Sequence, residues 1–191
     1  MSGAARRPSG RFARFTAPRR KVRGPAIGSI ARSCMPSDSP RLVLADSNVL
    51  VYAVDSGEQS KERRANEVLR ALGAAQVGII TPQVVAEFYS AVTRPRGGRP
   101  SLLDASSAEG WVDHWLSILT CVPLTEAISR EAVRGARDHQ LSIFDAQIWA
   151  SAKLSGASIV LSEDDQSAAF IEGVRFINPL ASGFLLEHIG L

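Results

Sequence analysis

The chain has few of the residues that build disulfide frameworks and zinc sites. Cysteine occurs only twice in 191 residues, as Cys34 and Cys121, and neither has the spacing of a zinc-binding motif. A fold stapled by several disulfides is therefore excluded, and a reducing compartment such as the cytoplasm fits best. We expect Cys121, which lies in an apolar stretch, to be a small core residue.

Long apolar runs, internal repeats and histidine motifs are also lacking. No apolar run is long enough to span a bilayer, so we expect no membrane association. The histidines His114, His139 and His188 are scattered, and we expect them at the surface or at helix ends. With 45% hydrophobic and 21% charged residues, the composition is that of a soluble globular protein large enough for one domain.

Acidic residues are nearly missing from residues 1–40, which hold nine basic residues and Asp38 as the single acid. This segment therefore carries a net charge of +8. Because the whole chain carries +3, residues 41–191 carry −5. Residues 1–40 are rich in Arg, Gly, Ser and Pro and have no apolar period, which predicts a basic, disordered tail. Residues 41–191 are predicted to form one folded domain.

Three interpretations of the tail stay open. Its clustered arginines suit a nucleic-acid-binding arm, because such clusters gain affinity by releasing counterions. An Arg-rich segment almost free of acids also suits a transit peptide. The third interpretation is an upstream start-site artefact. The only methionines are Met1 and Met35, and with Met35 as the true start residues 1–34 would not be translated.

From residue 41 onward, short apolar runs alternate with helix-like segments. Thr81 followed by Pro82 is a helix start signal, and Ser106 with Glu109 has the spacing of a capping box. The alternation predicts an α/β fold with a largely parallel sheet covered on both faces. The predicted strands are 41–46, 77–80, 120–124, 157–162 and 173–178, and the predicted helices are 47–54, 58–72, 82–94, 106–119, 125–139, 142–154 and 180–188.

Four acidic residues, far apart in sequence, fall at one edge of this predicted sheet. Asp46 and Asp164 each follow a strand, Glu87 lies in the helix after VGIITP, and Asp145 lies near the start of SIFDAQIWASAKL. Ligands bind beyond the carboxyl ends of parallel strands. Two unit charges about 4 Å apart there repel by about 4 kcal/mol, and a divalent cation would remove that cost. The four acids predict a metal-dependent enzyme that acts on phosphate.

Each acid also has a purely structural interpretation. Asp46 and Asp164 suit helix or turn caps, and Glu87 suits a solvated helix face. Asp145 suits a first-turn acid that faces the helix dipole, with Ser142 as the cap. Its helix is apolar nearly all round, however, so we expect Asp145 to be buried and to need a partner. The position of all four acids at one edge favours the functional interpretation.

Several segments resemble the PIN-domain ribonucleases and, within them, the VapC-type toxins of type II toxin–antitoxin systems. They are LADSNVLVYA, VVAEFYSAVTRPR, LSIFDAQIWASAKLSGASIVLSEDDQ and the closing GVRFINPL. The resemblance covers residues 41–191. It implies a three-layer α/β/α fold with a central, mainly parallel sheet, Mg²⁺ or Mn²⁺ in an acidic pocket, and endonucleolytic cleavage of RNA. It also implies a homodimer and a cognate antitoxin.

The resemblance assigns roles by position in these motifs. We expect Asp46 and Asp145 to be the principal metal ligands, with Glu87 and Asp164 completing the pocket directly or through water. Two departures from the family pattern are Asp165, where an apolar residue is common, and the Arg-rich tail. Glu163 and Asp165 flank Asp164, so which of these acids faces the pocket stays open. The four acids match the family's catalytic set, and the small polar residues Ser47, Asn48 and Ser162 match its supporting set.

An acidic pocket repels RNA, so basic residues must hold the backbone. The best candidates in the domain are Arg94, Arg96 and Arg99 in the segment TRPRGGRP, although a solvated loop is the alternative. Two other functions stay open. One is a PIN-type nuclease that acts on RNA or DNA without an antitoxin, and the other is a non-catalytic RNA-binding protein that uses the tail. EDTA would stop a nuclease but not a binding module.

The three tryptophans Trp111, Trp115 and Trp149 lie in long apolar helices. They could supply a dimer face. We expect core packing to be the use of most of these side chains.

Overall fold

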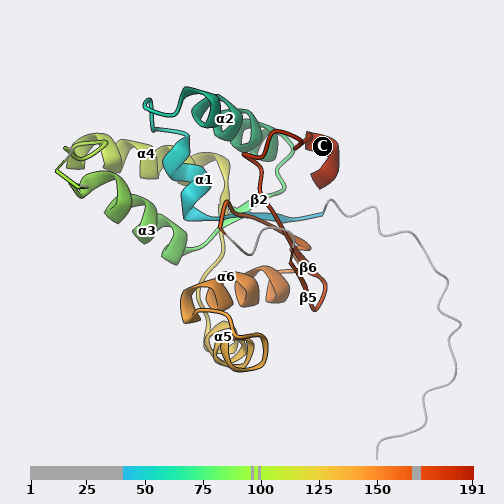
Figure 1. The fold of residues 1–191 in the computed structure, drawn as a ribbon. Helices are drawn as coiled ribbons and strands as arrows, with labels where there is room; N and C mark the ends of the chain where they lie inside the picture. The colour runs from blue at the N-terminus through green and yellow to red at the C-terminus, as the bar shows by residue number, and fades with distance from the viewer. Residues whose placement is uncertain (1–40, 96, 99, 165–168) are drawn as a thin grey trace, which may run out of the picture. The chain divides into compact units, whose positions relative to one another are not determined.

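The computed structural model of the chain describes residues 41–95, 97–98, 100–164 and 169–191 (Figure 1). The predicted tail at residues 1–40, and with it Met35, lies outside the described residues, as do Arg96, Arg99 and Asp165. Within the described ranges, no helix combines the length and the apolar character needed to cross a bilayer.

A six-stranded sheet forms the centre of the domain, with the strand order β3-β2-β1-β4-β6-β5. All neighbouring pairs are parallel except β5 and β6, which form an antiparallel hairpin. Strands β1, β2 and β4 are buried along their whole length, as expected of parallel strands covered on both faces. The strands are β1 Val43–Ala45, β2 Gly78–Ile80, β3 Thr120–Cys121, β4 Ile159–Leu161, β5 Phe170–Ile171 and β6 Val174–Ile177.

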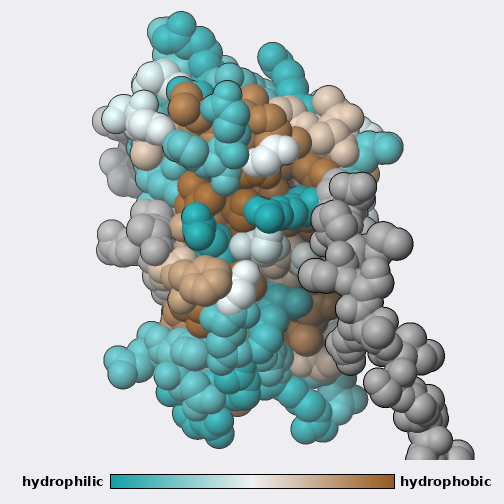
Figure 2. Space-filling view, turned by 90° about the vertical axis from the view of Figure 1, so that its right-hand side faces the viewer, coloured by the Kyte–Doolittle hydropathy of each residue, from teal (hydrophilic) through white to brown (hydrophobic). Residues whose placement is uncertain are grey.

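Helices cover the sheet in two layers. Helices α1 to α4 contact one another on one side, while α5 and α6 pack together on the other (Figure 1). The view toward the edge where β1 begins shows hydrophobic side chains between hydrophilic outer surfaces (Figure 2). The predicted three-layer α/β/α fold is thus confirmed. The helices are α1 Ser47–Tyr52, α2 Gln59–Ala74, α3 Pro82–Thr93, α4 Ala105–Ile118, α5 Glu126–His139, α6 Ile143–Leu154 and the 3-10 helix η1 Leu186–Ile189.

Side chains that cap the first turn explain where most of the helices begin. The Thr81 hydroxyl accepts a hydrogen bond from the Val84 N–H at 3.2 Å, with Pro82 at the first helical position, as predicted. At α4 the predicted capping box of Ser106 and Glu109 is wrong. Asp104 caps this helix instead, because its carboxylate accepts the Ser107 N–H at 2.9 Å. Aspartate is among the best N-cap residues, so the helix starts one residue earlier than predicted.

Other predictions differ from the structure at β5, at residues 180–188 and at Cys121. Strand β5 was not predicted, and the predicted helix at 180–188 is only the short η1 at its end. Cys121 is exposed on the edge strand β3 rather than packed in the core. Of the three tryptophans, Trp115 and Trp149 are buried as expected, whereas Trp111 is half-buried.

Trp149 organises the contact between α5, α6 and the β5–β6 hairpin. Its indole N–H donates to the Ile171 carbonyl at 3.1 Å, and Gly135 on α5 lies against its ring. Around this contact, the Glu172 carboxylate accepts hydrogen bonds from Arg134 and Lys153. The hairpin is therefore fastened to both helices of this layer.

Candidate active site

Asp46 lies at the carboxyl end of β1, in the middle of the sheet. Its backbone N–H donates to the Leu161 carbonyl of β4 at 2.9 Å, and the register pairs Ala45 with Leu161. Asp46 follows Ala45, and Ser162 follows Leu161. Asp46 and Ser162 therefore lie side by side at the ends of the two strands. The parallel sheet brings together two residues 116 positions apart.

Hydrogen bonds from three residues hold the Asp46 carboxylate. One oxygen accepts from the Ser47 N–H at 2.6 Å and the other from the Ser162 hydroxyl at 2.9 Å. The Asn48 amide donates to the Ser162 hydroxyl at 2.9 Å and, at 3.4 Å, to Asp46. Asp46 also caps α1, so the structural interpretation of this residue is confirmed, while the functional one stays a prediction. The predicted supporting residues Ser47, Asn48 and Ser162 all surround it.

The Asp46 carboxyl titrates far from its ordinary range. Burial raises its pKa from 3.8 to about 6, because a charged group loses its hydration there. The hydrogen bonds from Ser162 and from the Ser47 backbone oppose this shift, while the negative charges of Asp164 and Glu87 add to it. Asp46 thus lies near enough to Asp164 and Glu87 to feel their charge.

Glu87 is not a solvated surface residue, because two neighbours hold its carboxylate. The Ser47 hydroxyl donates to one oxygen at 3.0 Å, and the Gln83 amide donates to the other at 2.9 Å. Helix α3 thereby places Glu87 next to Ser47 at the start of α1, and Ser47 is the residue that follows Asp46.

Asp145 lies in the first turn of α6 and is only half-buried. Its N–H donates to the Ser142 hydroxyl at 3.1 Å, and that hydroxyl donates to the Asp145 carboxylate at 2.7 Å. The predicted cap is confirmed, but the expectation of a buried Asp145 is wrong. Ile143 and Phe144 beside it are 46% and 63% exposed, so only the later turns of α6 are covered. The Gln83 amide reaches the Phe144 carbonyl at 3.2 Å and thereby links α6 to Glu87.

The acids after β4 differ in direction. Glu163 forms an ion pair with Lys61 of α2 at 2.6 Å, and Lys61 also donates to the Tyr52 hydroxyl. The Asp164 N–H donates to the Ser162 hydroxyl at 3.3 Å, and its charge acts on Asp46. Of the two acids that the structure describes here, Asp164 is the one whose charge acts on Asp46.

Asp46, Glu87 and Asp164 therefore gather at the carboxyl ends of β1 and β4, which we call the acidic edge. Asp145 is linked to them only through its neighbour Phe144, whose carbonyl is bonded to Gln83. Within the described ranges, no three Asp, Glu, His or Cys side chains are close enough to hold a metal ion as they stand. Two buried side-chain oxygens near these acids, Asn48 Oδ1 and Gln83 Oε1, accept no hydrogen bond from any residue that the structure describes. Buried acceptors of this kind need a partner such as water or an ion. An oxygen-only set with two unfilled acceptors fits Mg²⁺ or Mn²⁺ with its bound waters.

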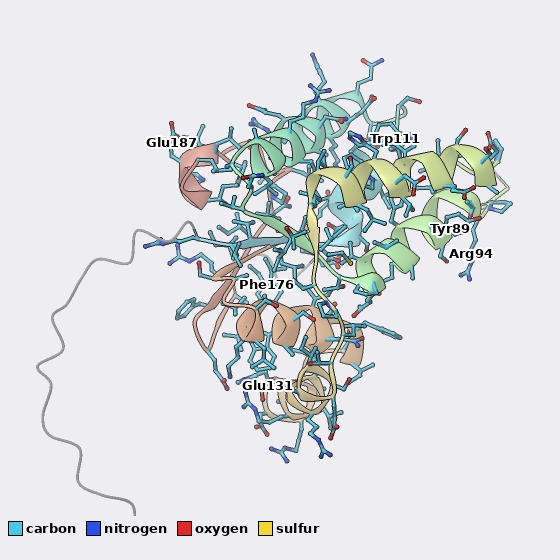
Figure 3. All side chains as sticks on the ribbon, turned by 180° about the vertical axis from the view of Figure 1, so that it is seen from behind. Tyr89, Arg94, Trp111, Glu131, Phe176 and Glu187 are labelled. Atoms are coloured by element: carbon cyan, nitrogen blue, oxygen red, sulfur yellow. The ribbon has the colours of Figure 1, made fainter. Side chains whose placement is uncertain are left out.

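A hollow of about 510 Å³ follows α3 away from the acids. Its lining includes Glu87, Ser90 and Arg94, which recur on one face of the helix. Arg94 and Tyr89 both lie toward the end of α3 that points away from the sheet (Figure 3). A second hollow, of about 1130 Å³, lies between α2 and α4 and is lined by residues such as Arg70 and Trp111. It contains none of the predicted site residues.

Gln83 and Lys61 are the connecting residues whose role the sequence did not reveal. Gln83 shares a helical face with Glu87 four residues later, so the spacing contained a signal. Lys61 pairs with Glu163 across 102 positions, and no local pattern marks such a contact.

Comparison with known proteins assigns the chain to a family. The model of the PIN domain matches residues 43–171, and the chain belongs to the PIN-domain family. No match was found among curated proteins.

Solved structures share the fold at low sequence identity. One is a chain in the structure of VapBC2 from Rickettsia felis bound to a promoter DNA fragment. Its TM-score is 0.53 and its sequence identity is 15%, and the match covers 71% of this chain and 96% of that one. A toxin-antitoxin complex from Klebsiella pneumoniae has a TM-score of 0.53 and 20% identity, with 72% and 97% covered. DNA-bound VapBC from Salmonella typhimurium has a TM-score of 0.51 and 14% identity, with 71% and 96% covered. At such identities the likeness is one of fold.

Proposed function

We propose that the chain is a Mg²⁺-dependent endoribonuclease and the toxin of a toxin–antitoxin pair. The observation that carries the proposal is the joining of three acids at one sheet edge. Ser162 and Ser47 hold Asp46, Ser47 also holds Glu87, and the charge of Asp164 acts on Asp46. Membership of the PIN-domain family and the shared fold with VapBC complexes support the nuclease and toxin assignments.

Asp46 and Asp145 are the proposed principal ligands of Mg²⁺, which Mn²⁺ can replace. Glu87 and Asp164 complete the pocket directly or through water. The unfilled oxygens of Asn48 and Gln83 suit hydrogen bonds from metal-bound water. A divalent cation bound there would supply an activated water and would neutralise the charge that develops on the phosphodiester.

The remaining side chains hold these acids in place. The Ser162 hydroxyl and the Asn48 amide orient Asp46, and the Gln83 amide orients Glu87 against α6. Locking each ligand by a second contact pre-organises the site, so less rearrangement is needed when substrate and metal bind.

RNA is the proposed substrate. Arginine residues at and after the end of α3 are proposed to bind its backbone. Arg94 lies about two helical turns from Glu87, or about 10 Å along the axis. It is exposed and lines the same hollow as Glu87, so it suits a backbone phosphate next to the cleaved one. We extend this role to Arg96 and Arg99. The proposed setting is the cytoplasm, with a homodimer and a cognate antitoxin as partners.

The experiment is cleavage of labelled tRNA, rRNA and mRNA fragments by the full chain, with Mg²⁺, Mn²⁺ or EDTA. We expect discrete cuts that disappear in EDTA. Asp145→Asn should reduce the rate by at least about 100-fold, because metal-assisted charge stabilisation is worth several kcal/mol. Asp113→Asn, an exposed acid on α4, is the matched control and should cut normally. Cutting that persists in EDTA, or equal loss in both variants, would contradict the proposal.

A further inference from the structure

Three aromatic side chains are exposed among the Phe, Tyr and Trp residues that the structure describes. They are Tyr89, Phe144 and Phe170, with exposed fractions of 40%, 63% and 66%. Phe170 borders a hollow with Arg41 and Ser158, which precede β1 and β4, so it lies at the edge opposite the acids. Tyr89 follows Glu87 by two residues, which turns it about 200° around α3. Phe144 alone of the three directly precedes one of the acids, Asp145.

Phe144 is also tied to the acidic edge by hydrogen bonds. The Gln83 amide that holds the Glu87 carboxylate at 2.9 Å reaches the Phe144 carbonyl at 3.2 Å. The Ser142 hydroxyl fixes the same turn of α6 through the Asp145 N–H. The backbone that carries the ring is therefore held on both sides while the ring itself faces water. A single exposed apolar side chain is common, but one fixed in this way beside an acidic edge has a defined place in the site.

The acidic edge creates a need that an exposed ring meets. The four carboxylates repel the phosphates of RNA, so attraction close to the cleaved bond requires either the metal or an uncharged contact. Every nucleobase has a flat face that stacks on an aromatic side chain, and such contacts carry no charge. Bases are free to stack in this way only where they are unpaired.

We propose that Phe144 is the platform on which one unpaired nucleobase stacks beside the scissile phosphate. This inference rests on the proposed ribonuclease function and names its substrate class, single-stranded segments and loops of RNA. Phe144 acts as a positioning residue: it holds the base, while the acids and their metal act on the phosphate. A paired duplex buries its base faces and gains nothing from the ring.

The test measures the binding of short single-stranded RNAs that carry the fluorescent base 2-aminopurine at one position in turn. The full chain is used with Ca²⁺, another oxygen-seeking cation, in place of Mg²⁺. We expect wild type to quench the fluorescence at one position. Phe144→Ala should lose that quenching and weaken binding by about 5- to 100-fold, the range that one stacked base supplies. Phe144→Trp should restore both, and a duplex of the same sequence should bind wild type and Phe144→Ala equally.

Ile143→Ala is the matched control, because Ile143 is 46% exposed in the same turn of the helix. It should bind as wild type does. Equal affinity of wild type and Phe144→Ala would overturn the proposal. So would loss of a dimer in Phe144→Ala during sedimentation, since the ring would then belong to an interface with a second copy.

A cleavage assay in Mg²⁺ separates this inference from the proposed function. Phe144→Ala should raise KM and leave kcat within about twofold, because stacking holds the substrate and does not act on the phosphate. Quenching at one position without any cleavage would overturn the nuclease but keep the platform. Cleavage with an unchanged KM in Phe144→Ala would overturn the platform and keep the nuclease.

Discussion

Asp46 combines two roles that conflict energetically. It caps α1 and is held by short hydrogen bonds, yet it is buried and feels the charges of Asp164 and Glu87. The folded chain therefore keeps a carboxylate in an unfavourable place at neutral pH. Such strain is common where a site is prepared for a ligand of opposite charge.

Asp46→Asn should remove cleavage and at the same time stabilise the metal-free protein. The folded-state pKa of about 6 lies above the ordinary 3.8, so the folded chain binds a proton more tightly than the unfolded chain. Wild type should lose stability as pH rises from about 4 to about 6 and stay at the lower value above that. We expect a gain of about 1–2 kcal/mol for Asp46→Asn at pH 7 and a smaller one near pH 4.

Urea unfolding in EDTA across this pH range measures the effect. Asp113→Asn is the control and should unfold like wild type at every pH. A variant less stable than wild type at pH 7 would show that the hydrogen bonds to the carboxylate outweigh its burial.

The proximity of Asp46, Glu87 and Asp164 was predictable, but their surroundings were only partly so. The order of strands and acids in the sequence fixes which sheet edge they share, and Ser47, Asn48 and Ser162 follow from it. The exposure of Asp145 does not follow, because an apolar helix does not reveal which of its turns is covered. The Lys61–Glu163 pair depends on how α2 lies over the sheet, which no local pattern encodes.

At the scale of elements, α5 and α6 pack tightly against each other at Gly135. A β-carbon added there would lie 2.5 Å from the Trp149 ring, and Trp149 is fully buried, so the ring has nowhere to move. Glycine in the middle of a helix normally costs stability relative to alanine. Here the missing side chain is what lets the two helices meet.

Gly135→Ala should therefore destabilise the protein by about 1–3 kcal/mol, the usual cost of overpacking a filled core. Gly110→Ala is the matched control, since Gly110 is also in the middle of a helix and a β-carbon there meets nothing within 4 Å. That control should gain about 0.5–1 kcal/mol from helix propensity. Thermal and urea unfolding compare the two, and shifts of equal sign would contradict the packing argument.

Element types were predicted better than element ends. Strong signals such as Thr81–Pro82 and the buried runs of β1, β2 and β4 located their elements closely. Strand β5 has only two residues and exists because it pairs with β6, so its own sequence contains too little pattern. In place of the predicted helix at 180–188, residues 179–183 form turns and only Leu186–Ile189 form a 3-10 helix, η1.

On the scale of the whole molecule, an ion-pair network joins α5, α6 and the β5–β6 hairpin. Glu131 accepts hydrogen bonds from Arg134 and Lys153, both at 2.7 Å, and its side chain is 19% exposed. The Arg134 guanidinium and then the Lys153 ammonium lower the Glu131 pKa from 4.5 to about 2. Glu172 in the hairpin turn contacts the same two cations, so the network spans three elements.

Glu131→Gln should cost about 1–2 kcal/mol of stability at pH 7, in line with charge-assisted hydrogen bonds that are partly buried. Because the folded-state pKa is lowered, this stability is fully present above about pH 4.5 and is lost as pH falls toward 2. The difference between wild type and the variant should therefore shrink below pH 4.5. Urea unfolding at pH 7 and pH 3.5 measures it.

Glu126→Gln is the control for this prediction. Its partner Arg130 lies on the same helix, and both side chains are 78% exposed, so its loss should cost less than about 0.5 kcal/mol. A difference that stays constant with pH would mean that the Glu131 charge plays no part.

The bond between Ser162 and Asp46 across 116 positions also sets an order of events in the life of the chain. While a ribosome is still making α6, Asp46 has been synthesised but β4 has not, so neither Ser162 nor Asp164 is available to it. Contacts so distant in sequence are among the last to form. A nascent chain therefore has no complete acidic edge, and whatever chemistry that edge performs begins only after nearly the whole domain has been made.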